Sequence, residues 1–195
     1  MYVTVLQLSL IGITYFIAAI PFGLLVARLK NINLREIGSG NIGATNVYRA
    51  MGAKYGILVF LLDAIKGGIP TYVATLVDPN PLFHILIGAI AVTGHSLSCY
   101  VKFKGGKGVA TGAGVIIALS PIIGLVMIIL AVILIYITRY VALTSIVCAI
   151  ATPLLFYILK YPLAYVGMFA VIGIFIIIRH RSNIERLLKG TENKV

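Results

Sequence analysis

Small, hydroxyl and amide residues are concentrated in one short segment, residues 38–49 (GSGNIGATNVYR). Its three glycines within six residues let backbone N–H groups turn toward a bound ligand. Arg49 adds a guanidinium that can bind phosphate oxygens through two parallel hydrogen bonds. Neutral hydrogen-bonding groups come from Ser39, Asn41, Thr45 and Asn46. The alternative, a flexible loop between helices, rarely has this density of small and amide residues, so the segment predicts an anion site.

A second segment, residues 103–111 (FKGGKGVAT), places glycines and two lysines, Lys104 and Lys107, just before an apolar run. Where such a segment opens a helix, free N–H groups, the positive end of the helix dipole and ammonium groups converge on an anion. It is not a Walker A motif, because Val101 and Gly108 stand where that motif needs Gly and Ser or Thr. The alternative is a basic loop that only anchors the chain at a membrane surface.

A third segment, residues 179–192 (RHRSNIERLLKGTE), forms a basic tail. His180 and Asn183 are three residues apart, so a helix would place both side chains on one face. The alternative is a tail that binds acidic lipid headgroups without further chemistry.

Three isolated polar residues stand in or beside apolar runs. Asp63 and Lys66 are three residues apart, which predicts a pair with each other or with a loop, in support of a site. His95 follows Gly94 near the end of another run, where packing or capping is the commoner role of a histidine. The carboxylates are too few to hold Mg²⁺, and two isolated cysteines give neither a disulfide framework nor a metal site.

The composition places these segments in a membrane protein. Hydrophobic residues make up 61% of the 195 residues, the mean hydropathy is +1.08, and only 11% of residues are charged. A soluble domain of this size could not cover its surface with so few polar groups. The net charge of +11 favours anionic partners. Nucleic acid is excluded, because the basic residues stand in short loops between apolar runs.

Apolar runs of the length that a bilayer requires, about 20 residues, recur along the chain. They cover residues 3–29, 55–77, 82–101, 141–159 and 162–178. The stretch 109–138 is either one tilted helix or two helices broken at Ser120-Pro121, because proline disfavours helical geometry in the preceding residue. The tail beyond residue 179 is spaced for a short amphipathic helix.

The distribution of Lys and Arg decides between these alternatives. With a break at Ser120-Pro121, 14 of these 16 residues fall on one side of the membrane, Lys160 falls on the other, and Lys66 lies within a span. By the positive-inside rule the N-terminus is then outside and the tail cytoplasmic. We therefore expect an all-α integral membrane protein with about seven transmembrane helices in one domain, residues 1–195. The three polar segments should meet at the cytoplasmic face, and the first helix of the broken pair should be short and tilted or only partly crossing.

The three segments also resemble one protein family. The sequences GSGNIGATNVYR (38–49), Gly94-His95 with FKGGKGVAT (103–111), and RHRSNIxRLLxGxE (179–192) are similar, in this order, to the motifs of bacterial acyl-phosphate:glycerol-3-phosphate acyltransferases, the PlsY family. The resemblance covers the whole chain. It implies transfer of a fatty acyl group from acyl phosphate to the 1-hydroxyl of glycerol 3-phosphate, giving lysophosphatidic acid and inorganic phosphate as the first step of phospholipid synthesis. It also implies the bacterial cytoplasmic (inner) membrane, with the active site facing the cytoplasm.

The resemblance and the residue chemistry together give each candidate a role. The catalytic candidates are Ser39, Arg49, Lys107, His180 and Asn183. The substrate-binding candidates are Gly40, Asn41, Thr45, Asn46, His95, Lys104, Gly105, Gly106 and Gly108. Structural support is expected from Asp63, Lys66 and Glu192. We expect Arg49 and Lys107 to bind phosphates, and backbone N–H groups of residues 105–108 to stabilise the oxyanion that forms during acyl transfer.

Several points stay open at this level. The proton acceptor is either His180, since histidine titrates near neutral pH, or a substrate phosphate. Arg179 and Arg181 disfavour a protonated His180, which favours a positioning role for it. The sequence does not decide which basic residue meets which phosphate, which acyl chains are preferred, or the oligomeric state. We expect no cofactor, no metal and no obligatory protein partner besides membrane lipid and the two substrates.

Overall fold

The computed structural model describes residues 4–195. Within that range the regular structure is helical, with ten α-helices, one 3-10 helix and no strand. The chain divides into two compact units, Met1–Leu119 and Ser120–Val195. The first unit carries α1 (Val5–Ala19), α2 (Phe22–Arg28), α3 (Ala44–Met51), α4 (Ala53–Val77), α5 (Pro81–Ser96), η1 (Cys99–Val101) and α6 (Val109–Leu119). The second carries α7 (Pro121–Thr138), α8 (Val141–Ile158), α9 (Leu163–Arg179) and α10 (Arg181–Leu188). The all-α prediction is confirmed, and the prediction of one domain stays a prediction.

The break at Ser120-Pro121 is real. Ser120 has extended geometry (φ −154°, ψ 97°), and its hydroxyl accepts a hydrogen bond from the backbone N–H of Ile123 in the first turn of α7. Pro121 is the first residue of that helix, a position where its missing N–H is harmless. The stretch 109–138 is therefore two helices, and the amphipathic tail helix is present as α10.

The lengths of the helices decide which can cross a bilayer. Four are long and apolar enough by themselves, namely α4, α5 continued through η1, α7 and α8. Two bent pairs pass the same test, α1 with α2 (40°) and α9 with α10 (60°), which gives up to six spans. With 11 residues, α6 is only about 16 Å long, about half of the hydrocarbon thickness. The seven predicted segments are helical, but the first, expected as one span, is divided at Ile20-Pro21 into α1 and α2, and α6 cannot cross alone. The number of crossings and their direction stay predictions.

Helix α4 is the centre of the first unit, because α1, α3, α5 and α6 all pack against it. Small residues let α6 approach α4 closely. A Cβ on Gly67 would lie 2.5 Å from the carbonyl oxygen of Thr111, and a Cβ on Gly114 would collide with the carbonyl oxygen of Ala64. Such close backbone contact is a common way of packing helices in membranes. This contact with α4 holds α6, the helix that follows the second polar segment, in place.

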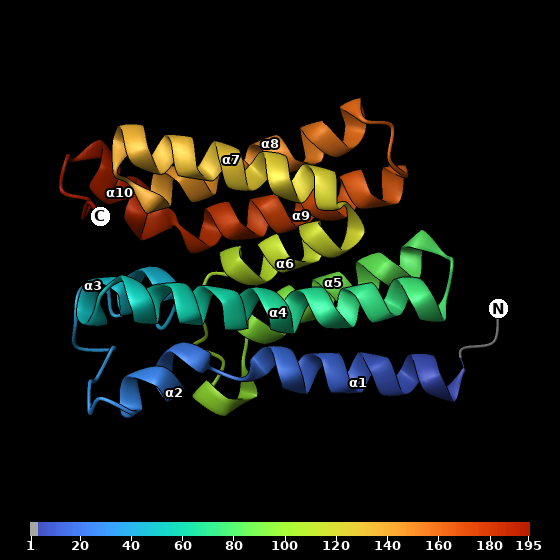
Figure 1. The fold of residues 1–195 in the computed structure, drawn as a ribbon, viewed down its shortest axis with the longest axis horizontal. Helices are drawn as coiled ribbons and strands as arrows, with labels where there is room; N and C mark the ends of the chain where they lie inside the picture. The colour runs from blue at the N-terminus through green and yellow to red at the C-terminus, as the bar shows by residue number, and fades with distance from the viewer. Residues whose placement is uncertain (1–3) are drawn as a thin grey trace. The chain divides into compact units, whose positions relative to one another are not determined.

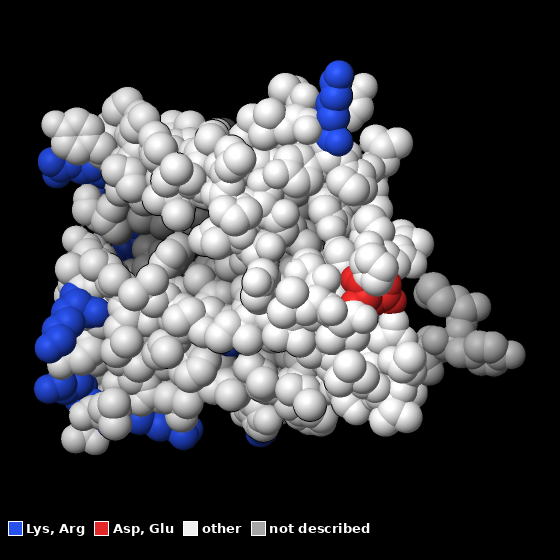
Figure 2. All heavy atoms as spheres, turned by 45° about the vertical axis from the view of Figure 1, so that its right-hand side comes forward, with Lys and Arg blue, Asp and Glu red and all other residues white. Residues whose placement is uncertain are grey.

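Both polar segments of the first unit lie at the same end of its helices. Helix α4 begins directly after α3, and α5 runs back antiparallel to it after the turn at residues 78–80 (Figure 1), so α5 ends beside the first half of α4, where His95 lies 3.6 Å from Asp63. The hydroxyl of Ser98 donates to the carbonyl oxygen of Ala19 (2.6 Å), which joins the end of α5 to the end of α1. On the face shown in Figure 2, several groups of Lys and Arg atoms lie along the left side and a group of Asp and Glu atoms lies at the right.

The second unit is built around α8, which packs on α7 and α9. Phe156 of α8 stacks on Phe169 of α9, with the ring centroids 4.6 Å apart. Near the start of α7, the hydroxyls of Ser120 and Tyr161 lie 2.7 Å apart. Helix α10 packs against α8 and α9, which holds the third polar segment on this unit.

Candidate active site

Asn46 holds the first polar segment in place from inside. Its side chain is 1% exposed, its Oδ1 accepts from the N–H of Ser39 (3.0 Å), and its Nδ2 donates to the carbonyl oxygens of Leu34 (3.1 Å) and Ile37 (3.0 Å). Gly38 has a positive φ (59°), and a Cβ there would collide with Asn46 Oδ1, so only glycine fits beside this amide. The hydrogen bonds of Asn46 therefore serve the segment itself.

The exposure of other side chains in this segment is consistent with a role in binding a ligand. Ser39 is exposed, and within residues 4–195 its hydroxyl makes no hydrogen bond. Thr45 and Arg49 are half-buried on α3. Asn41 Oδ1 accepts from the N–H of Gly43 (2.8 Å), which shapes the turn into α3. Gly40, also predicted to bind substrate, has a φ of 66° in the same turn.

The second segment folds back onto the end of α5. The N–H of Gly105 donates to the carbonyl oxygen of Ser96 (3.0 Å), and that of Gly106 donates to the carbonyl oxygen of His95 (3.3 Å). A Cβ on Gly105 would collide with the carbonyl oxygen of His95, and one on Gly106 would collide with His95 Nε2. Gly108 has a φ of 86°, so it too needs to be glycine.

These hydrogen bonds correct one expectation about the oxyanion site. The N–H groups of Gly105 and Gly106 point into the protein, because each donates to a carbonyl oxygen at the end of α5. Of the expected oxyanion donors at residues 105–108, only the N–H groups of residues 107 and 108 remain candidates, together with those in the first turn of α6. Lys107 is half-buried and Lys104 is exposed, so this segment presents one ammonium close to the protein and one in solvent.

A buried ionic cluster lies behind the second segment. Lys66 Nζ is 2.7 Å from Asp63 Oδ1 and also donates to the carbonyl oxygen of Ile20 (2.7 Å), at the break between α1 and α2. His95 Nδ1 lies 3.6 Å from the same carboxylate oxygen, and all three side chains are at most 7% exposed. The predicted pair of Asp63 and Lys66 is confirmed. His95 lies between this pair and Gly106, in the packing position expected of a helix-end histidine.

We expect Asp63→Ala to lower the free energy of unfolding by about 3–5 kcal/mol, because it leaves the Lys66 ammonium buried without a counter-charge. The double variant Asp63→Leu/Lys66→Met removes both charges and should be more stable than the single variant. Titration with sodium dodecyl sulfate in mixed micelles, followed by circular dichroism, measures both. Equal midpoints for Asp63→Ala and the wild type would show that the pair does not support the fold.

The third segment is organised by Glu192. Its Oε1 accepts from Asn183 Nδ2 (2.9 Å), and its Oε2 accepts from Arg186 Nε (2.7 Å). His180 and Asn183 are each 3% exposed, and His180 Nδ1 lies 2.8 Å from the carbonyl oxygen of Ile176. Because a carbonyl oxygen only accepts, Nδ1 carries the proton of this bond. These contacts fit the supporting role expected of Glu192.

We expect Glu192→Ala to lower the free energy of unfolding by roughly 2 kcal/mol, because it leaves the buried amide of Asn183 and the guanidinium of Arg186 without their acceptor. Glu185→Ala is the matched control, since Glu185 is exposed on α10, the helix that carries Asn183 and Arg186. The same detergent titration compares the two. Equal losses for both variants would contradict the role of Glu192.

The structure brings together some of the predicted residues. Arg35, which precedes the first segment, donates from Nη2 to the carbonyl oxygen of Lys104 in the second (2.6 Å). His180, Asn183 and Glu192 belong to the second unit, and their meeting with the other two segments stays a prediction. The expected absence of a metal also stays a prediction. Within residues 4–195 there is no group of three or more His, Cys, Asp or Glu side chains that could hold an ion.

Two buried hydroxyls in or beside the second segment were given no role in the sequence analysis. Ser96 and Thr111 are both 0% exposed, and neither hydroxyl has a hydrogen-bond partner among the described residues. No sequence signal marks them, because a helical Ser or Thr usually bonds to its own backbone, as Thr71 does. Arg35 was likewise counted only as a basic loop residue.

Comparison with known proteins identifies the family. The sequence model of the family described as glycerol-3-phosphate acyltransferase matches residues 8–190. The chain belongs to the glycerol-3-phosphate acyltransferase family. A family member from Aquifex aeolicus is 44% identical over 190 residues, which are 96% of this chain and 98% of the relative. Another, from Fusobacterium nucleatum, is 41% identical over 185 residues, which are 94% of this chain and 95% of the relative.

Solved structures of this acyltransferase family have the same fold. A crystal structure of PlsY, an integral membrane glycerol 3-phosphate acyltransferase, in its glycerol 3-phosphate form is 43% identical, with a TM-score of 0.94 over 97% of this chain and 95% of that one. The lysophosphatidic acid form is 42% identical, with a TM-score of 0.91 over 96% and 94% of the two chains. This acyltransferase is thus an all-helical integral membrane protein, as its composition predicted.

Proposed function

We propose that this chain transfers a fatty acyl group from acyl phosphate to the 1-hydroxyl of glycerol 3-phosphate, at the cytoplasmic face of a bacterial inner membrane. The observation that carries the proposal is the position of the first two polar segments at one end of the first unit, where Asn46 holds the N–H of Ser39 and the side chains of Arg49 and Lys107 are half-buried. Both proposed substrates are phosphates, and one carries a long apolar chain. A site where a basic surface meets apolar helices suits both.

The reaction needs little from the protein beyond binding and orientation. The hydroxyl oxygen of glycerol 3-phosphate attacks the acyl carbonyl carbon, and the bond from that carbon to the phosphate oxygen breaks, so that inorganic phosphate leaves with the electron pair. Arg49 and Lys107 bind the two phosphates, assisted by Lys104. Ser39, Thr45 and Asn183 orient the reacting groups. N–H groups at residues 107 and 108 and in the first turn of α6 stabilise the oxyanion, each worth about 2.7–4 kcal/mol by analogy with known oxyanion holes.

Two groups remain candidates for the proton of the attacking hydroxyl. The hydrogen bond from His180 Nδ1 to the carbonyl oxygen of Ile176 places a proton on Nδ1, so that the neutral form of this ring would have Nε2 as its proton acceptor. The same bond also fixes the ring, which suits a positioning role. The alternative acceptor is an oxygen of a substrate phosphate. In both cases the products are lysophosphatidic acid and inorganic phosphate.

The donor is tested with purified protein in detergent, without a second compartment. We expect lysophosphatidic acid to form from palmitoyl phosphate and glycerol 3-phosphate. With palmitoyl-CoA in place of palmitoyl phosphate, the rate should be at least about 100-fold lower, on the order of the discrimination that binding of a reactive group gives. EDTA should leave the rate unchanged within about twofold, since no step above uses an ion. Formation of product with palmitoyl-CoA but not with palmitoyl phosphate would overturn the proposed donor. Loss of activity in EDTA that Mg²⁺ restores would overturn the metal-free mechanism.

A further inference from the structure

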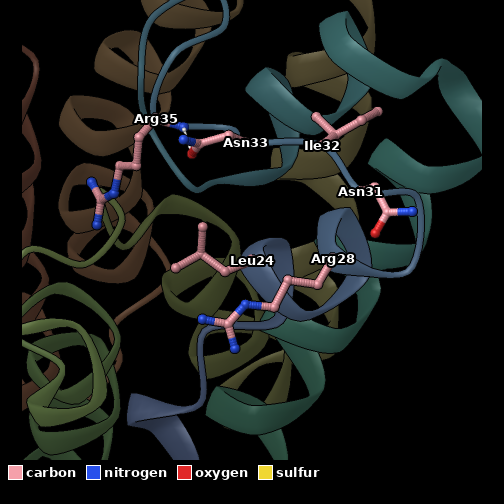
Figure 3. A pocket seen from close by; sticks show the side chains of 6 residues that line it. All are labelled: Leu24, Arg28, Asn31, Ile32, Asn33 and Arg35. Carbon is pink, nitrogen blue, oxygen red and sulfur yellow. Dashed lines mark hydrogen bonds between the residues drawn. The ribbon is translucent and has the colours of Figure 1, made fainter.

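An open pocket of about 450 Å³ lies beside the end of α2. Its lining residues are Leu24, Arg28, Asn31, Ile32, Asn33 and Arg35 (Figure 3). All six belong to the first unit, and none lies in residues 38–49 or 103–111. The proposed acyl transfer uses none of them.

Two guanidinium groups of the pocket lack a carboxylate partner. Arg28 has no hydrogen bond or ion pair within residues 4–195, and the hydrogen bond of Arg35 goes to a neutral carbonyl oxygen, that of Lys104. The nearest acid in sequence, Glu36, accepts instead from Asn33 Nδ2 (2.6 Å). Figure 3 shows both guanidinium groups extending to the same side of the pocket, with Leu24 between them. Paired guanidinium groups without a counter-ion are suited to a phosphate group.

The rest of the lining is partly apolar and stands at the expected membrane surface. Leu24 and Ile32 pack against the buried core formed by Val26, Ala27, Leu34, Val47 and Val59. On the outer side of the same stretch, Leu25 is 42% and Leu29 is 80% exposed, as expected where a span ends in lipid. A pocket with two cations and an apolar wall fits a phosphate that is carried on an apolar stem.

The pocket is held in shape by the backbone around it. The N–H of Ile32 donates to the carbonyl oxygen of Ala27 (3.0 Å), and Asn31 between them has a φ of 54°. Asn33 Oδ1 accepts from the backbone N–H of Arg35 (3.2 Å), as the dashed line in Figure 3 marks. The side chain of Arg35 is fixed at its far end by Lys104. The two cations therefore stand on an ordered turn.

We propose that this pocket binds the phosphate group of an anionic lipid, as a site separate from the one that performs acyl transfer. Arg28 and Arg35 bind the phosphate oxygens, and Leu24 and Ile32 contact the first carbons of the lipid. Because Arg35 also bonds to Lys104, a lipid in this pocket would contact the same guanidinium that holds the second polar segment. The same chemistry could also accept a free phosphate, and the experiment separates the two sources.

Native mass spectrometry of the purified protein in a non-ionic detergent measures the binding. The probes are dioleoyl phosphatidylglycerol, dioleoyl phosphatidylcholine and inorganic phosphate. Arg28→Gln removes one cation of the pocket. Lys30→Gln is the matched control, because Lys30 is exposed on the same turn, lies 5.8 Å from the ring of Tyr55 and does not line the pocket.

We expect Arg28→Gln to weaken phosphatidylglycerol binding on the order of fivefold, the contribution of one basic residue at a lipid surface, and Lys30→Gln to change it by less than twofold. Phosphatidylcholine binding should not respond to either variant. If inorganic phosphate binding falls in Arg28→Gln while phosphatidylglycerol binding does not, the phosphate site stands and its ligand is the soluble anion. Equal effects of the two variants on phosphatidylglycerol, or no effect of Arg28→Gln on either phosphatidylglycerol or inorganic phosphate, would overturn the site. Neither result bears on the acyl-transfer assay, which is measured separately.

Discussion

Replacing Arg49 by alanine should lower kcat/KM for glycerol 3-phosphate by about 100- to 1000-fold, the usual effect of removing one charge-stabilising donor from an active site. Arg49 is half-buried on α3, and the segment that precedes this helix is fixed by the three hydrogen bonds of Asn46. A guanidinium in such a place can bind a phosphate through two parallel hydrogen bonds. The measurement is initial rates of lysophosphatidic acid formation with purified, folded protein.

Two further variants separate geometry from charge at this position. Arg49→Lys keeps the charge but loses the planar pair of donors, so its kcat/KM should lie between those of alanine and wild type. Lys54→Ala removes an exposed cation at the start of α4 and should stay close to wild type. Near-normal kinetics of Arg49→Ala would remove Arg49 from phosphate binding.

Gly106→Ala should lower kcat/KM about 100-fold, as expected when a binding segment shifts by about 1 Å. The added methyl group would overlap His95 Nε2, and the ring cannot retreat easily because Asp63 lies on its other side. The segment that carries Lys107 would have to move instead. The effect should appear mainly as a raised KM for glycerol 3-phosphate.

A second substitution tests this steric explanation. His95→Ala makes room for the methyl group, so the double variant Gly106→Ala/His95→Ala should be more active than Gly106→Ala alone. A double-mutant cycle on kcat/KM gives the coupling between the two positions. Independent, additive losses would mean that His95 acts on the substrate directly, as one of the substrate-binding residues expected from the sequence.

Local signals in the sequence were sufficient for much of the fold. A proline after a capping serine ends one helix and starts the next, which is why the break at Ser120-Pro121 was predictable. Two opposite charges three residues apart in an apolar run have few partners but each other, and Asp63 and Lys66 do pair. The break at Ile20-Pro21, which divides the expected first span into α1 and α2, was not predicted.

Contacts between residues that are distant in the sequence could not be predicted from such local signals. Asn46 looked like one more ligand-binding amide, because nothing local shows that its partners are the backbone groups of Leu34, Ile37 and Ser39. The glycines of the second segment looked like free donors, whereas the carbonyl oxygens at the end of α5 accept from two of them. Charge counting favoured seven crossings with a short first helix in the broken pair, and the 11 residues of α6 confirm that this helix is too short to cross alone.

The most direct test of the proposed site compares two lysines of one loop. Initial rates of lysophosphatidic acid formation from acyl phosphate and glycerol 3-phosphate are measured for purified wild type, Lys107→Ala and Lys102→Asn. Lys102 is exposed with a φ of 53°, a geometry that asparagine tolerates, so its replacement removes a charge without strain. We expect Lys107→Ala to lose about 100-fold in kcat/KM and Lys102→Asn to stay within about twofold of wild type. Equal rates for the two folded variants would contradict a phosphate site at the start of α6.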